Sequence, residues 1–304
     1  MSGESDLIHA LRALANDPAA RGLADDAAVL DWGGKRLVLT HDMLVESVHF
    51  LPGDPPETVA WKLLAVNLSD LAAKGARPIG ALMGYSLRGD PNWDAGFVRG
   101  LKVALNHFGV PLLGGDTVTS PTRMLGLTLL GEASGSVPDR RGANMGDALF
   151  VTGTLGDAAL GLSLLQAGVN APAALIEAYR LPLPQLEAGA MISVFSPAMM
   201  DVSDGLLIDA ARMADASQVG IRIDLDALPL SADFVAIAGS DRAARLRAAT
   251  GGDDYQLLFV SGRPLPILPC PVTRIGQIVR GSGVHLHDSG GDVTLPDRLG
   301  WEHQ

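Results

Sequence analysis

The sequence predicts a two-domain protein of mixed α/β (α+β) class. Its 304 residues exceed the usual size of one domain, and 47% of them are hydrophobic while 19% are charged, which is enough apolar side chain for large cores. Strand-like and helix-like segments occur in both halves without a regular alternation of the two. We therefore expect two mixed units rather than one doubly wound parallel sheet.

The first half contains three helical patterns. Apolar residues recur at helical spacing from Leu7 to Leu14, which predicts a short entry helix. The run Asp54-Pro55-Pro56-Glu57 opens a long helix, with Asp54 as the expected cap and Gly75 as the stop. Asp90-Pro91 opens another helix that ends near Gly109.

Apolar runs bounded by turn residues predict the strands. In the first half these strands are expected at 27–31, 36–40, 79–87, 111–113 and 124–132. In the second half they are expected at 148–152, 198–202, 221–225 and 255–260, followed by two C-terminal strands, with helices after Asp157 and Asp204. The segment 134–146 is rich in glycine, serine and proline, so we place the domains at 1–135 and 136–304.

Charge and cysteine content exclude several classes of protein. A formal net charge of −11 argues against a broad nucleic-acid surface or a polybasic membrane patch. The single cysteine, Cys270, cannot form an internal disulfide and suits a reducing compartment. The first residues lack the basic and apolar regions of a secretory signal, and the longest uncharged run is interrupted by polar residues and proline. We expect a cytoplasmic protein with no nucleic-acid or membrane partner.

Aspartates at strand ends, in glycine-rich loops and on an apolar helix are the main sign of function. Asp42 and Asp201 directly follow apolar runs, where an unpaired buried charge is unfavourable. Asp70 shares a helix face with Asn67 and Lys74. The other aspartates of this kind are Asp25, Asp26, Asp116, Asp204, Asp253 and Asp254.

Each of these aspartates alone is most often a cap or a turn residue, but together they require a compensating cation. Mg²⁺ is the natural candidate, because it prefers oxygen ligands and the chain has one cysteine and seven histidines. Several ions around a polyphosphate would suit five or six aspartates. The Walker A, dinucleotide, protein-kinase and serine-hydrolase motifs are all missing.

Seven segments match the motifs of one known family in order and in spacing. They are Asp25–Ala28, Thr40–Phe50, Ala65–Gly75, Gly114–Thr117, Val151–Asp157, Asp201–Leu206 and Gly251–Tyr255. The chain resembles the thiamine-monophosphate kinases, which belong to the aminoimidazole-ribonucleotide synthetase-like ATP-binding superfamily. The resemblance runs from about residue 20 to the C-terminal residues around Trp301.

The resemblance implies a fold and an activity. The fold would be a two-domain subunit with a C-terminal α/β sandwich, and two subunits would form a homodimer through their N-terminal sheets. The activity would be the ATP- and Mg²⁺-dependent phosphorylation of thiamine monophosphate to thiamine diphosphate by direct in-line transfer.

The resemblance also assigns roles by position. Metal-binding positions are Asp26, Thr40, His41, Asp42, Asp70, Asp116, Asp201 and Asp204. ATP-contacting positions are Gly115, Asp116, Arg140 and Ser203. Positions that contact the acceptor are His49, Asp253 and Trp301. The residues expected to be catalytic are Asp42, Asp116, Arg140 and Asp204.

Three positions depart from the family pattern. His41 stands where a threonine is common, Asp253 where glutamate is usual, and Leu23-Ala24 where the family has Ile-Gly. Two alternatives stay open at this point: another ATP-dependent enzyme of the superfamily, such as an aminoimidazole-ribonucleotide or selenophosphate synthetase, or a non-catalytic nucleotide-binding homologue. Selenophosphate synthesis relies on a reactive N-terminal cysteine, whereas the only cysteine here is Cys270.

Overall fold

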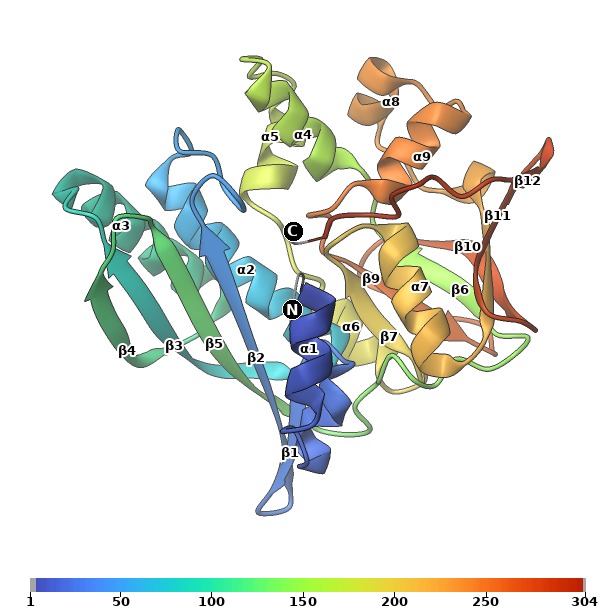
Figure 1. The fold of residues 1–304 in the computed structure, drawn as a ribbon, viewed down its shortest axis with the longest axis horizontal. Helices are drawn as coiled ribbons and strands as arrows, with labels where there is room; N and C mark the ends of the chain where they lie inside the picture. The colour runs from blue at the N-terminus through green and yellow to red at the C-terminus, as the bar shows by residue number, and fades with distance from the viewer. Residues whose placement is uncertain (1–3, 303–304) are drawn as a thin grey trace.

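The computed structural model describes residues 4–302, and within this range the strands form two mixed sheets with helices packed on them (Figure 1). The first sheet has the order β1 (Ala28–Trp32), β2 (Lys35–Val45), β5 (Met124–Ala133), β3 (Arg77–Leu87) and β4 (Leu112–Thr119). Only its β3–β4 pair is parallel. The mixed α/β class is confirmed.

The second sheet is built from the other half of the chain. Its order is β12 (Gly291–Val293), β11 (Gly283–Asp288), β8 (Gly220–Asp224), β10 (Val272–Val279), β6 (Ala148–Thr152), β9 (Gln256–Ser261) and β7 (Met199–Val202). The β8–β11 pair is parallel and the others are antiparallel. Two separate mixed sheets were expected, and a doubly wound sheet is not what the described residues form.

Two long helices cover one face of the first sheet (Figure 1). α2 (Pro56–Ala73) packs against β2, β5 and β3, and α3 (Pro91–Phe108) packs on α2. Asp90 caps α3 by accepting a hydrogen bond from Trp93 N at 3.1 Å, and Gly109 ends it in the left-handed conformation with φ 65°. Both boundaries follow the sequence signals.

The shorter helices belong mainly to the second half. They are α1 (Glu4–Arg12), α4 (Asp157–Gln166), α5 (Ala173–Arg180), α6 (Leu186–Ile192), α7 (Leu206–Ser217), α8 (Ala232–Ala238) and α9 (Arg242–Thr250), with the 3₁₀ turns η1 (Pro18–Leu23) and η2 (Leu225–Ala227). α7 packs on β7, β8 and β11. No helix within residues 4–302 has both the length and the apolar character that crossing a membrane requires.

Three local expectations differ from the structure. Asp54 does not cap α2: its side chain accepts from Leu51 N and from Arg180 Nε, both at 2.8 Å, and Pro55 takes the cap position. The glycine-rich run 114–117 lies inside β4 instead of following it. β2 continues to Val45 because β5 pairs with it along its whole length, so His41 and Asp42 are strand residues.

α2 is also the element that joins the two halves. It contacts β7 of the second sheet as well as α6, and a Cβ at Gly189 of α6 would lie 2.1 Å from the Ala72 carbonyl oxygen. The backbone of α6 can approach α2 this closely only because Gly189 has no side chain. The segment 134–147 connects the sheets, and the domain boundary between residues 135 and 136 stays a prediction.

The α2–α3 contact provides a test of the packing. A Cβ at Gly100 of α3 would lie 2.3 Å from the Glu57 carbonyl oxygen of α2. Alanine favours helices over glycine by about 1 kcal/mol. We nevertheless expect Gly100→Ala to lower the free energy of unfolding by about 1–3 kcal/mol, because the helices must separate. Urea unfolding followed by circular dichroism measures the change.

Val103→Ala, at an exposed site of the same helix, is the control and is expected to change stability by less than about 0.5 kcal/mol. A Gly100→Ala protein as stable as the parent would show that the two helices are not packed this closely.

Candidate active site

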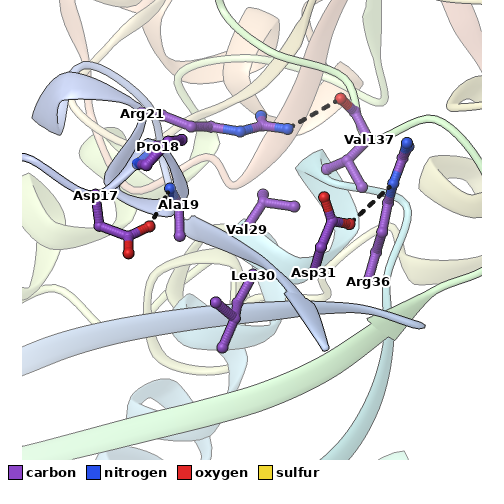
Figure 2. A pocket seen from close by; sticks show the side chains of 9 residues that line it. All are labelled: Asp17, Pro18, Ala19, Arg21, Val29, Leu30, Asp31, Arg36 and Val137. Atoms are coloured by element: carbon purple, nitrogen blue, oxygen red, sulfur yellow. Dashed lines mark hydrogen bonds and ion pairs between the residues drawn. The ribbon is translucent and has the colours of Figure 1, made fainter. Parts of the chain in front are cut away.

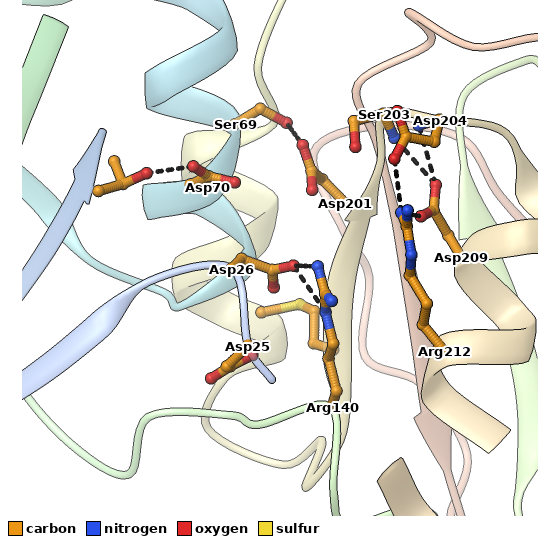
Figure 3. A network of polar contacts seen from close by, with 12 residues as sticks. Asp25, Asp26, Ser69, Asp70, Arg140, Asp201, Ser203, Asp204, Asp209 and Arg212 are labelled. Atoms are coloured by element: carbon orange, nitrogen blue, oxygen red, sulfur yellow. Dashed lines mark hydrogen bonds and ion pairs between the residues drawn. The ribbon is translucent and has the colours of Figure 1, made fainter. Parts of the chain in front are cut away.

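Three aspartates from distant parts of the chain meet between the two sheets (Figure 3). Asp26 precedes β1, Asp70 lies on α2 and Asp201 lies on β7, and each offers a carboxylate oxygen within 4.8 Å of the others. Two hydroxyls orient this cluster: Thr40 donates to Asp70, and Ser69 Oγ donates to Asp201 Oδ2 at 2.6 Å. Oxygen ligands at this spacing suit a hard divalent cation.

The carboxylate of Asp42 adds to the negative potential of this site. Asp42 lies on β2, where Asn67 of α2 accepts a hydrogen bond from its backbone N–H at 3.0 Å. Burial, together with the nearby charges of Asp204 and Asp26, raises the pKa of Asp42 from 3.8 to about 6.

The two central carboxylates are the most strongly perturbed. Burial, and then repulsion from Asp42, Asp201 and Asp26, raises the pKa of Asp70 well above its usual value. Burial and the charge of Asp26 likewise raise the pKa of Asp201, although the hydrogen bond from Ser69 opposes this effect. Like charges confined in a buried site resist ionisation together, so the cluster lacks positive charge.

Asp26 differs because two built-in cations hold it. Arg140 Nε donates to its Oδ1 at 2.9 Å, and the ammonium of Lys74 lies 2.7 Å from its Oδ2. Burial alone would raise the pKa of Asp26, but the charges of Arg140 and Lys74 lower it instead. Asp26 is therefore an ionised carboxylate at the edge of the cluster.

A second polar group lies beside the cluster at the start of α7 (Figure 3). Asp209 Oδ2 accepts from the backbone N–H groups of Ser203, Asp204 and Gly205 at 3.1–3.2 Å, which fixes this loop. Arg212 pairs with Asp204 at 2.6 Å and with Asp209 at 2.7 Å. The loop thus presents Ser203 and Asp204 with an arginine behind them.

Two of the three expected acceptor contacts share one lysine. Lys62 Nζ donates to Asp253 Oδ2 at 2.7 Å and to the His49 carbonyl oxygen at 3.1 Å. Asp253 also accepts from Tyr255 Oη at 2.9 Å. Asp253 and Tyr255 both have positive φ, 67° and 50°, a strained conformation for residues other than glycine.

Trp301 lies next to the loop that precedes α7. Its backbone N–H donates to the Asp204 carbonyl oxygen at 2.9 Å, and half of the residue is exposed. Gly300 approaches so closely that a Cβ there would lie 2.5 Å from the same oxygen. The C-terminal segment around Gly300 therefore crosses the loop that carries Asp204.

Within one chain the structure does not bring His41, Gly115 or Asp116 to the cluster. Side chains alternate along β2, so His41 points to the face opposite Asp42, where its Nδ1 lies 2.8 Å from Thr128 Oγ1. Gly115 and Asp116 lie on β4, and β5 and β3 stand between β4 and β2. Their metal and ATP roles stay predictions.

Sequence reasoning gave no role to several residues that shape the site. They are Lys62, Ser69, Lys74, Asp209, Arg212 and Tyr255. One signal was available: Lys74 follows Asp70 by four residues, on the polar face of an otherwise apolar helix. The glycine-containing turn 153–157 binds another part of the chain, because the backbone N–H of Gly156 donates to both carboxylate oxygens of Asp254 at 2.9 Å.

A pocket of about 450 Å³ lies between η1 and β1 (Figure 2). It contains Arg21 and Arg36, but Arg21 donates to the Val137 carbonyl oxygen at 3.2 Å and Arg36 lies 3.6 Å from Asp31. Both arginines are thus already paired, and the pocket offers no uncommitted charge to a phosphate.

The class of the protein follows from comparison with family models. Residues 24–133 match the N-terminal domain of AIR synthase related proteins, and residues 144–253 match the C-terminal domain of the same proteins. The first match spans all five strands of the first sheet, and the second spans β6, β7 and β8 of the second sheet.

Comparison with individual proteins identifies the family within this class. A thiamine-monophosphate kinase of Caulobacter vibrioides is 41% identical, with 94% of this chain and 86% of the relative covered, and that of Salmonella typhimurium is 36% identical, with 93% and 91% covered. A solved structure, AaThiL complexed with AMPPCP and TMP, superposes with a TM-score of 0.89 at 34% identity, over 99% of this chain and 97% of that one. The chain belongs to the thiamine-monophosphate kinase family of AIR synthase related proteins.

The raised pKa of Asp42 predicts how stability depends on pH in the absence of divalent cations. The pKa of Asp42 is 3.8 in the unfolded chain and about 6 in the fold, so the protonated carboxyl favours the folded state. This stabilisation is complete below pH 3.8 and is lost as the pH rises through about 6. Asp42→Asn removes the ionisation, so in EDTA we expect it to raise the free energy of unfolding at pH 8 by up to about 3 kcal/mol and to change it little at pH 4.

Thermal unfolding between pH 4 and 8 measures this difference. Asp31→Asn, at a side chain that is 86% exposed, is the control and should follow the parent protein at every pH. Parallel pH profiles for Asp42→Asn and the parent would show that Asp42 is not strained by its neighbours.

Proposed function

We propose that this chain transfers the γ-phosphoryl group of ATP to thiamine monophosphate, in line, giving thiamine diphosphate. The family membership supports the reaction, since the relatives carry this name and AaThiL was solved with AMPPCP and TMP. The observation that carries the proposal in this chain is the buried cluster of Asp26, Asp70 and Asp201 with Asp42 beside it. We propose the cytoplasm as its compartment, because a single cysteine suits a reducing environment.

The residues of the cluster fit Mg²⁺. All are carboxylates, and one oxygen of each of Asp26, Asp70 and Asp201 lies within 4.8 Å of the others. Burial, and then the charges of neighbouring aspartates, raises the pKa values of Asp70 and Asp201. Asp26, Asp42, Asp70 and Asp201 would hold the ions, which when bound supply positive charge for the phosphates.

The chain's own residues then position the two substrates. Arg140 sits at one edge of the cluster, and Ser203 and Asp204 line the loop at the other. The phosphate of the acceptor has a second pKa of about 6 and is an anion at neutral pH, so no general base is needed. Orientation and charge stabilisation account for the catalysis that the site must provide.

We place the acceptor's rings near Asp253. A pocket of about 400 Å³ opens there, with Trp61, Leu183 and Asp157 in its wall. An aromatic and an acidic wall suit a cationic thiazolium ring. Lys62 holds Asp253 in place, and Trp301 would contact the acceptor from the α7 side.

The test is direct measurement of the product. The purified protein, supplied with ATP, Mg²⁺ and thiamine monophosphate, is expected to form thiamine diphosphate, detected by chromatography. Asp70→Asn is expected to lower kcat by at least about 100-fold, because a lost ligand removes several kcal/mol of charge stabilisation. Asp31→Asn is the matched control and should retain parental kcat.

Other outcomes have distinct meanings. ATP consumption without thiamine diphosphate would point to another reaction of the superfamily. Absence of ATP consumption with a folded, ATP-binding protein would indicate a non-catalytic homologue. Full activity of Asp70→Asn would remove Asp70 from the site.

We also propose that the chain forms a homodimer through the uncovered face of its first sheet. Asp116, Gly84, Gly126 and Met43 lie in one row across this face, opposite the face that α2 covers. The face exposes large apolar side chains, among them Met43, Leu82 and Val118. A second copy on this face would bury them and would bring His41 and Asp116 into an interface.

Light scattering tests the dimer. The parent is expected to be dimeric at micromolar concentration, and Leu82→Glu is expected to be monomeric with an unchanged circular dichroism spectrum. Val98→Glu, on the exposed side of α3, is the control and should remain dimeric. A monomeric parent would contradict the proposal.

A further inference from the structure

Lys74 is a fully buried lysine next to a proposed magnesium centre. It follows α2 directly, and its side chain is 0% exposed. A buried ammonium needs a partner for each of its three N–H groups. The chain provides three acceptors: Asp25 Oδ1 at 2.5 Å, Asp26 Oδ2 at 2.7 Å and the Met199 carbonyl oxygen at 3.3 Å.

These acceptors come from separate parts of the fold. Asp25 and Asp26 belong to the loop before β1, and Met199 begins β7 of the second sheet. Asp25 is held from its other side by Arg21, which also donates to the Pro138 carbonyl oxygen at 2.7 Å. Three acceptors from separate segments thus hold the ammonium in one position, in the same way that several protein ligands hold a metal ion.

Charge is distributed unevenly over the cluster. At one end, Asp25 and Asp26 are neutralised by Arg21, Lys74 and Arg140. At the other end, Asp42, Asp70 and Asp201 have no cationic side chain in any described ion pair. The ammonium of Lys74 therefore already supplies the positive charge that the carboxylate pair Asp25–Asp26 would otherwise require from a bound ion.

We propose that Lys74 takes the place of one divalent cation in this centre, at the Asp25–Asp26 side of the cluster. The proposal rests on the proposed function, since it concerns the same magnesium centre. Mg²⁺ binds oxygen at about 2.1 Å, so an ion on Asp26 Oδ2 and Asp25 Oδ1 would overlap the ammonium. The ammonium and the metal ion cannot both occupy this position. Because the lysine is part of the chain, the metal ion is the one that is excluded.

Removing the ammonium should therefore create an ion site. Mn²⁺ replaces Mg²⁺ on oxygen ligands and is counted from the electron paramagnetic resonance signal of the free ion. In the absence of nucleotide and acceptor, Lys74→Met is expected to bind one more Mn²⁺ per chain than the parent. Lys74→Arg, which keeps a buried cation, is expected to bind the parental number.

Lys102→Met is the matched control, since it removes the same charge from an exposed site on α3. It should leave the Mn²⁺ count unchanged. An equal count for Lys74→Met and the parent would overturn the proposal, and so would an equal gain in Lys102→Met.

A second readout follows thermal stability. Without divalent cations, Lys74→Met is expected to unfold at a lower temperature than the parent, because Asp25 and Asp26 lose a shared counter-charge. Saturating Mg²⁺ should then raise its unfolding midpoint more than that of the parent. An equal rise in both proteins would show that Lys74 has only a structural role.

A variant that keeps the charge balance covers the case in which Lys74→Met does not fold. Asp25→Asn combined with Lys74→Met removes one negative and one positive charge, and frees Asp26 Oδ2. The same gain of one Mn²⁺ is expected, and an unchanged count would overturn the proposal. These counts use no ATP and no thiamine monophosphate, so their failure is distinct from failure of the kinase assay.

Discussion

Compensation of buried negative charge is the constraint on which the rest of the structure depends. Asp26 of the loop before β1, Asp42 of β2, Asp70 of α2 and Asp201 of β7 converge in a space with little solvent. Burial, and then their mutual repulsion, raises the pKa of Asp42, Asp70 and Asp201. Added positive charge stabilises the ionised form of such a site, and this couples the fold to its ions and substrates.

α2 meets this constraint along its length. Lys62 binds Asp253 in the first half of the helix. Ser69 and Asp70 face the cluster in its last turns, and Lys74 reaches Asp25 and Asp26 directly after the helix ends. The remaining positions are mostly buried and apolar, which fixes the helix between the two sheets. A rigid element packed on both sides can hold polar groups at defined positions.

The two sheets contribute different parts of the site. The first half supplies Asp26, Asp42 and Asp70, while the second supplies Asp201 and the Ser203–Asp204 loop. The three backbone N–H groups bound by Asp209 make that loop rigid. Because the halves meet at α2, β7 and Arg140, a change in how they pack would separate the acidic residues from the arginine.

The sequence by itself determined the class, the two mixed units and both ends of α3, because proline, glycine and capping residues act locally. Asp90 caps α3 and Gly109 ends it as expected. It also singled out the aspartates, since a carboxylate after an apolar strand or on an apolar helix is conspicuous. The motif resemblance then indicated the family, because seven segments in register are more specific than any one of them.

Only the tertiary structure decided which of these residues meet. Strand pairing determined that β2 continues through His41 and Asp42, whose side chains point to opposite faces. It also placed two strands, β5 and β3, between β2 and the β4 strand that carries Asp116. Asp54 binds Arg180, which is distant in the sequence, instead of capping α2. Lys74 likewise binds Asp25 and Asp26 through long-range contacts. Such contacts join residues far apart in the chain, and local propensity carries no information about which distant partner a side chain will have.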